Sequence, residues 1–289
     1  MAAAAREIGR TGVRVYPIGL GAMPLSLEGR PDEATALAVI KAALEAGVDF
    51  IDTADSYCRD ETDVGHNERL IAMALQRLGA GGRVHVATKG GLIRPGGDWR
   101  SDARPERLKA ACERSLRDLG VETIFLYQLH GPDARVPYLD SVGALVELQR
   151  AGKIRHIGLS NVDARQFKAA AGICRVESVQ NRCNAREAGD FRNGVVAACA
   201  AGGSAYIAHS PVGGYWGHKS TARHKVLAEV ARECGASPYR VLLAWLLAKG
   251  PHILPIPGAS RVASIVDSAA APTLALSPEQ VRKIDALGR

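Results

Sequence analysis

Short apolar runs alternate with amphipathic segments along almost the whole chain. The apolar runs are continuous, as expected for parallel strands that are buried on both faces. Between them, apolar residues recur at spacings of three and four, which predicts helices. Eight strands are predicted, at residues 17–21, 48–51, 84–89, 123–128, 154–159, 178–180, 205–208 and 253–256.

Helices are predicted to follow these strands, and a small hairpin over residues 6–15 precedes them. Gly47, Gly120 and Gly152 stand where helices are expected to end. The predicted helices lie between Glu33 and Gly47 and over residues 66–78, 105–119, 138–150, 163–171, 191–201, 221–234, 238–249, 263–269 and 278–287.

Eight strand–helix units in about 280 residues match the size of a (β/α)8 barrel, or TIM barrel. A doubly wound open sheet is the alternative. However, no GxGxxG pattern follows the first strand, as a nucleotide-binding version of that fold would require. No stretch has the composition of a linker. The sequence therefore predicts one α/β domain over residues 1–289, a TIM barrel with an N-terminal β-hairpin.

The composition disfavours several classes of protein. No apolar run approaches the ~20 residues of a membrane helix, and the first ten residues lack the apolar region of a secretion signal. The net charge of +7 comes from dispersed Lys and Arg without interleaved aromatics, so nucleic-acid binding is not expected. A mildly basic surface instead suits a phosphorylated small ligand.

The six cysteines include no CxxC pair, and several fall in helical apolar patterns. They are predicted to be free thiols in a reducing cytoplasm. No metal site is predicted. The oligomeric state is left open between a monomer and a weak homo-oligomer.

Polar residues stand where three successive strands end. Asp52, with Tyr57 five residues later, follows the second strand, Lys89 ends the third, and His130 follows the fourth. Because the carboxyl ends of barrel strands converge on one mouth, these side chains are expected to meet there. The Lys89 ammonium is predicted to lower the pKa of Tyr57, with Asp52 holding Lys89 charged. His130 can donate a hydrogen bond to a carbonyl oxygen.

Such a set can protonate an oxygen as negative charge develops on it, which suits carbonyl reduction. No side chain can deliver the hydride, so a nicotinamide cofactor is required. Taken singly, each residue has a structural alternative: a loop aspartate, a packed tyrosine, a buried histidine or a solvated lysine. Lys89 is also a candidate Schiff-base lysine.

Four motifs resemble the aldo-keto reductase superfamily, and the resemblance runs nearly end to end. They are residues 47–57 (GVDFIDTADSY), 86–89 (VATK), 126–130 (LYQLH) and 152–161 (GKIRHIGLSN). The resemblance implies hydride transfer between a nicotinamide and a carbonyl or alcohol. It also implies that Tyr57 is the general acid and base, and that Asp52, Lys89 and His130 complete the catalytic set.

The same resemblance implies where the cofactor binds. Ser160, Asn161 and Gln180 would hold the nicotinamide carboxamide, and His209 stands where the family commonly has a stacking tyrosine. Arg261 is placed to take the 2′-phosphate of NADP, so NADP(H) is favoured and NAD(H) is possible. The full set of implied cofactor residues is Gly21, Met23, Asp52, Ser160, Asn161, Gln180, His209, Ser210, Pro211, Val212, Gly258, Ser260, Arg261, Asp267 and Ser268.

Trp99, Tyr215 and Trp216 are candidate walls of the substrate pocket, with surface aromatics as the alternative. The chain looks like bacterial-type members, which include pyridoxal and aldehyde reductases and sugar dehydrogenases. We therefore expect an aldehyde, ketone, sugar or pyridoxal-like substrate. Two other functions stay open: a cofactor-binding regulatory subunit of the same fold, and a Schiff-base lyase that uses Lys89.

Overall fold

Eight parallel strands form one sheet in the computed structural model, which describes residues 4–288 without the side chains of Tyr215 and Trp216. The strands are β3 (Leu20–Gly21), β4 (Phe50–Asp52), β5 (His85–Gly90), β8 (Ile124–Leu129), β9 (Ile154–Ser160), β10 (Val176–Arg182), β11 (Ala205–His209) and β12 (Ile253–Ile256). Each of these strands pairs in parallel with the one that follows it in this order.

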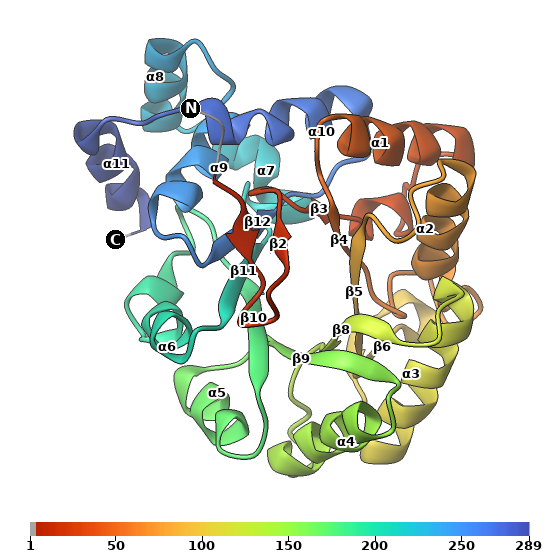
Figure 1. Ribbon diagram of the computed structural model, residues 1–289. Helices are drawn as coiled ribbons and strands as arrows, with labels where there is room; N and C mark the ends of the chain where they lie inside the picture. The colour runs from red at the N-terminus through yellow and green to blue at the C-terminus, as the bar shows by residue number, and fades with distance from the viewer. Residues whose placement is uncertain (1–3, 289) are drawn as a thin grey trace.

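The two edge strands of this sheet, β3 and β12, meet and close it into a barrel. The amide of Gly19 donates to Pro255 O at 3.0 Å, and the amide of Gly21 donates to Pro257 O at 3.0 Å. A side chain at Gly21 would not fit this seam, because its Cβ would lie 2.8 Å from Ile256 O. The predicted (β/α)8 barrel is therefore confirmed (Figure 1).

The predicted N-terminal hairpin is also present. It consists of β1 (Arg6–Glu7) paired antiparallel with β2 (Arg14–Val15). Ile8 and Val15 are buried against apolar side chains of the barrel strands, and the amide of Arg10 donates to Glu177, near the start of β10, at 2.7 Å. The hairpin covers the amino end of the barrel, where Figure 1 shows it lying across the ring of strands. The carboxyl ends of the strands therefore form the opposite, uncovered mouth.

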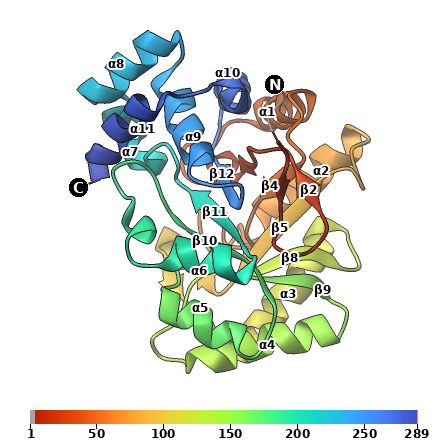
Figure 2. The ribbon, with the colours of Figure 1, turned by 60° about the vertical axis from the view of Figure 1, so that its left-hand side comes forward.

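Helices surround the barrel (Figure 2). They are α1 (Glu33–Glu45), α2 (His66–Arg77), α3 (Pro105–Leu119), α4 (Tyr138–Arg150), α5 (Ala164–Ala171), α6 (Val195–Gly202), α7 (Gly214–Ala222), α8 (Lys225–Cys234), α9 (Pro238–Ala248), α10 (Val262–Ala269) and α11 (Pro278–Asp285). The apolar face of α3 is buried through Leu108, Cys112 and Leu116. Each large apolar side chain that is fully buried in this way contributes about 1.5–3 kcal/mol.

Two predicted helices begin in the wrong place. The helix predicted from residue 191 begins only at Val195, because Gly194 adopts a left-handed φ of 92° just before it. The predicted helix 221–234 is confirmed over residues 225–234, which form α8, but residues 214–222 form a separate helix, α7, and a short break lies between the two. Gly213, with φ of 102°, is the N-cap of α7. Gly213 and Gly214 therefore mark the start of a helix.

The segment after β5 contains a second small hairpin that the glycine-rich sequence does not reveal. It pairs β6 (Leu92–Ile93) antiparallel with β7 (Arg100–Ser101). Trp99 lies directly before β7, and its ring lies near those of Tyr57 and His130. This hairpin therefore carries an aromatic side chain over the mouth of the barrel.

Candidate active site

The four predicted catalytic residues come together at the barrel mouth. Asp52 is the last residue of β4, Lys89 lies near the end of β5, and His130 directly follows β8. Tyr57 lies in the turn after β4, where its amide donates to Ala54 O at 3.2 Å. All four are buried, with Lys89 fully inaccessible. Strand register therefore unites residues that the sequence separates by up to 78 positions, from Asp52 to His130.

Lys89 is the centre of this cluster. Its Nζ donates to Asp52 Oδ2 at 2.6 Å, to Thr53 O at 2.8 Å and to Tyr57 Oη at 2.9 Å. An ammonium has three donors, so this arrangement satisfies each of them. A buried ammonium is tolerated only when it is paired in this manner. Tyr57 Oη is therefore held within hydrogen-bond distance of a positively charged group.

The electrostatics of Lys89 and Tyr57 follow from burial and from this pairing. Burial opposes the charge on Lys89, yet Asp52 and Tyr57 hold its pKa above the ordinary value. Burial raises the pKa of Tyr57, and the Lys89 ammonium opposes that rise. The pKa of Tyr57 therefore lies above its ordinary value. Lys89 acts in the expected direction, but the cost of burying a phenolate outweighs it.

Asp52 binds two amides besides Lys89. Gln180 Nε2 donates to Asp52 Oδ1 at 2.7 Å, and Gln128 Nε2 donates to the same oxygen at 3.2 Å. Gln128 is not among the predicted site residues, although a lone amide in an apolar strand, two residues before His130, is a usable signal. Gln180 was expected to hold a nicotinamide, and here its amide nitrogen supports Asp52.

The His130 ring lies close to the rings of Tyr57 and Trp99. Burial, together with the Lys89 charge, holds its pKa well below the ordinary value, so the ring is neutral. Its Nδ1 lies 3.3 Å from Ser56 Oγ. A Ser56 hydroxyl that donates to Nδ1 leaves the ring hydrogen on Nε2, where it can be donated to a substrate oxygen.

Residues at the ends of β9 and β11 complete the mouth. Asn161 Nδ2 donates to His130 O at 2.8 Å and to Ser160 Oγ at 3.1 Å. His209 Nδ1 lies 3.1 Å from Ser210 Oγ. Burial lowers the pKa of His209 to about 3, with Lys89 and Arg182 acting in the same direction. A neutral imidazole can present its face to a flat ring.

Asn161 and Ser210 have left-handed φ angles of 57° and 54°, and no other non-glycine residue in the described range does. Left-handed backbone is costly for residues with a side chain, and it is found mostly where the surrounding structure enforces it, as at ligand sites. Both residues were predicted from the resemblance to contact the cofactor. Their strain is an independent observation at the same two strand ends.

The other predicted cofactor residues come from β3 and the segment after it, from the segments after β11 and β12, and from α10. Gly21 and Gly258 form the closing bridge of the barrel. Asp267 is engaged by Arg240 through bonds of 3.1 and 2.8 Å and by Ser237, and Ser268 is buried. The remainder comprises half-buried Met23 and Val212, buried Pro211, and exposed Ser260 and Arg261 at the start of α10.

Trp99 is the one candidate substrate residue whose side chain the structure describes. Its ring lies edge-on to Tyr57 and His130, with centroids 6.4 and 6.2 Å away, and Arg94 stacks on it at 4.3 Å. The side chain is 44% exposed. Tyr215 and Trp216 lie in α7, and their side chains lie outside the described part of the chain.

Comparison with known proteins identifies the family. The model of the aldo/keto reductase family matches residues 17–289. The chain belongs to the aldo/keto reductase family. It is therefore an NAD(P)H-dependent oxidoreductase of the bacterial type.

Two curated proteins illustrate the similarity. Pyridoxine 4-dehydrogenase of Escherichia coli is 35% identical over 287 residues, which cover 95% of this chain and 96% of that protein. An uncharacterized oxidoreductase of Schizosaccharomyces pombe is 33% identical, over 95% of this chain and 87% of that protein. The identity therefore extends over the whole barrel rather than over isolated motifs.

Solved structures agree with this assignment. A thermostable aldo-keto reductase in complex with the inhibitor epalrestat is 29% identical, with a TM-score of 0.83 and coverage of 98% and 99% of the two chains. An aldo-keto reductase from Klebsiella pneumoniae in complex with NADPH is 25% identical, with a TM-score of 0.84 and coverage of 99% and 95%.

The site fits a nicotinamide cofactor by its own chemistry. Asp52, Tyr57, Lys89 and His130 can hold and move a proton, but none of them can supply a hydride. No group of His, Cys, Asp and Glu within the described residues is arranged to hold a metal ion. Within residues 4–288 no helix has the length and apolar character to cross a membrane. All six cysteines are free thiols.

Proposed function

We propose that this enzyme reduces the carbonyl group of a small aldehyde or ketone, with NADP(H) as cofactor and Tyr57 as proton donor. The observation that carries the proposal is the buried Lys89 Nζ, which binds both Asp52 and Tyr57 Oη. This arrangement has no evident structural purpose, because a buried ion pair is weak evidence for stability. It has a clear chemical purpose, which is to stabilise a phenolate when Tyr57 gives up its proton.

Each residue has a separate task in this mechanism. The bound cofactor supplies the hydride. His130, as the neutral ring, donates a hydrogen bond to the carbonyl oxygen and positions it. Tyr57, kept protonated by its raised pKa, transfers its proton to that oxygen as negative charge develops. Lys89 stabilises the phenolate that remains, and Asp52 keeps Lys89 charged. In the reverse direction the phenolate removes the proton from an alcohol.

Residues around the mouth would hold the cofactor. Ser160 and Asn161 would bind the carboxamide, and His209 would stack on the nicotinamide in place of a tyrosine. Ser260 and Arg261 are exposed at the N-terminus of α10, where a phosphate is favoured by free amides and by the helix dipole. The NADPH and NADP complexes of structural relatives support NADP(H) over NAD(H).

The substrate is expected to be a small, flat carbonyl compound such as pyridoxal or an aromatic aldehyde. Trp99 and His130 offer ring faces and edges next to Tyr57, and such surfaces bind planar rings by stacking. The name of the E. coli relative, pyridoxine 4-dehydrogenase, points to the same class.

An assay of NADPH and NADH oxidation against pyridoxal, aromatic aldehydes, aliphatic aldehydes and sugars tests this proposal. Turnover of an aldehyde, faster with NADPH, is the expected result. Cofactor binding without turnover of any compound would instead favour the regulatory subunit. A substrate trapped on Lys89 by borohydride would favour the lyase. The raised pKa of Lys89 speaks against a lyase, since a Schiff-base amine must be neutral to attack.

A further inference from the structure

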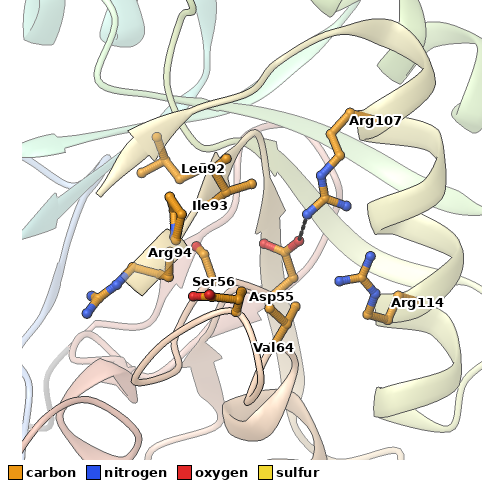
Figure 3. A pocket seen from close by; sticks show the side chains of 10 residues that line it. Asp55, Ser56, Val64, Leu92, Ile93, Arg94, Arg107 and Arg114 are labelled. Atoms are coloured by element: carbon orange, nitrogen blue, oxygen red, sulfur yellow. Dashed lines mark ion pairs between the residues drawn. The ribbon is translucent and has the colours of Figure 1, made fainter. Parts of the chain in front are cut away.

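A cavity of about 260 Å³ lies behind the turn that carries Tyr57. It is bounded by that turn, by residues after β5 and by α3, as Figure 3 shows. Its charged lining residues are Asp55, Glu61, Arg94, Arg107 and Arg114. Three guanidinium groups therefore face two carboxylates across one small space. None of these residues belongs to the candidate active site.

Asp55 is the unusual member of this group. It is only 1% exposed, and neither of its carboxylate oxygens has a hydrogen-bond partner among the described residues. Its backbone is held in place, because its amide donates to Lys89 O at 3.3 Å and its carbonyl accepts from Gly65 N at 2.8 Å. The side chain is thus forced into the cavity with unused acceptors, which normally costs about 1–3 kcal/mol.

Arg107 and Arg114 face Asp55 from α3. They are seven residues apart and so share one face of the helix, and Figure 3 shows both side chains directed toward Asp55. Arg107 Nη2 lies 3.9 Å from Asp55 Oδ2, which is an ion-pair contact but too long for a hydrogen bond. Within residues 4–288 neither guanidinium makes a hydrogen bond, so both retain free donors.

The other two charged residues already have partners. Arg94 stacks on Trp99 and donates from Nη2 to Arg59 O at 3.1 Å, and its Nε lacks a partner among the described residues. Glu61 accepts the amide of Gly96 at 2.5 Å and lies at an exposed edge. The inner cavity therefore offers donors from two arginines and acceptors from one aspartate. A matching ligand needs oxyanion acceptors for the arginines and a hydrogen-bond donor for Asp55.

We propose that this cavity binds a small oxyanion that carries a hydroxyl donor, of which hydrogen phosphate is the simplest example. Arg107 and Arg114 bind its oxygens, since guanidinium groups match phosphate geometry. The hydroxyl of the ion donates to Asp55. Ser56 lines the same cavity, and its Oγ lies 3.3 Å from His130 Nδ1. Ser56 therefore connects the bound ion to the candidate active site.

Calorimetric titration of the full chain with inorganic phosphate tests this proposal. The titration is run at pH 8, at constant ionic strength set with chloride, and with saturating NADP⁺ to occupy other phosphate-binding groups. We expect saturable binding that is at least tenfold weaker in Arg107→Gln/Arg114→Gln. Arg117→Gln removes one positive charge, as each of the two single variants does, from an exposed position of α3 and is expected to bind phosphate normally.

Circular dichroism of each variant checks folding, and the two single variants replace the double variant if it does not fold. Absence of saturable binding, which would mean that the cavity holds only water, overturns the proposal. Undiminished binding in the arginine variants overturns it too, because the ion then binds elsewhere. These readouts do not involve catalysis and so are independent of the proposed reduction.

A comparison of phosphate with sulfate tests the role of Asp55. Sulfate has the same shape but no hydroxyl at pH 8, so it leaves Asp55 without a donor. We expect phosphate to bind about tenfold more tightly, the ratio that one hydrogen bond to a charged group supplies. In Asp55→Asn the amide can donate to either ion, and the preference is expected to disappear. Equal affinities in the unmodified protein overturn the assignment of Asp55.

Discussion

Asp52 and Asp55 lie three residues apart on the same strand and turn, and each is 1% exposed. Asp52 is bound by an ammonium and by two glutamine amides. Asp55 has no hydrogen-bond partner in the described structure, and its pKa rises to about 6 through burial, opposed by Arg107 and Arg114. Equal burial therefore produces two different groups. The number of donors within reach decides whether a buried carboxylate is well bonded or destabilising.

The largest effect is expected from removing the cation of the well-bonded carboxylate. Lys89→Met leaves Asp52 buried without its charge partner and leaves Tyr57 without support for a phenolate. Breaking such a pair typically costs about 3–5 kcal/mol of unfolding free energy. Denaturant unfolding measures this loss, and NADPH oxidation is expected to fall to background. Substantial reductase activity in this variant would contradict the mechanism.

The next largest effect is expected from Tyr57→Phe. It removes the proton donor while keeping the ring, so carbonyl reduction should fall by about 10²–10⁴-fold. Cofactor binding, followed by fluorescence quenching, is expected to persist. Tyr127→Phe is the matched control, because Tyr127 is also a buried tyrosine and lies in β8 outside the cluster. If both variants reduce aldehydes at the original rate, Tyr57 is not the acid.

A smaller effect, of opposite sign, is expected at the poorly bonded carboxylate. A carboxyl with a raised folded pKa binds its proton more tightly when folded, so stability falls as pH rises from about 4 to about 6 and stays reduced above. Asp55→Asn removes this penalty, with a gain of up to about 3 kcal/mol at pH 8.

Chemical denaturation at pH 4, 6 and 8 in phosphate-free buffer measures that gain. The stability difference between variant and parent should grow between pH 4 and 6 and then level off. Asp52→Asn, the same substitution three residues earlier, is expected to destabilise instead, because it leaves Lys89 without an anion. Destabilisation of Asp55→Asn at pH 8 would show that Asp55 has partners after all.

The smallest effect is expected at Gln128. Gln128→Leu removes one of the two amide donors to Asp52 Oδ1, and the bond is long at 3.2 Å. The loss should be about 1.5 kcal/mol, the lower end for a hydrogen bond to a charged group. Thermal and denaturant unfolding measure it. A loss as large as that of Lys89→Met would mean that the amides, rather than the ammonium, hold Asp52.

Much of the fold and the meeting of the candidate catalytic residues at one mouth were predictable from the sequence. Helices such as 105–119 and 138–150 were predicted with their observed bounds, because their apolar spacing and end signals agree. Helix 221–234 was predicted with its observed end but the wrong start, since Gly213 begins an additional helix, α7, through a left-handed N-cap. A glycine that ends one helix and a glycine that begins another look the same in a sequence.

The sequence alone determined which residues end the strands, and therefore that Asp52, Lys89 and His130 share one mouth. The reason is that strand periodicity and barrel topology depend on local apolar patterns. Only the tertiary structure decided how each buried group is bonded, because hydrogen-bond partners come from distant strands and helices. It brought Gln128 and Gln180 to Asp52. At Tyr57, burial raises the pKa by more than the Lys89 charge lowers it. Asp55 was left facing Arg107 and Arg114 across a cavity.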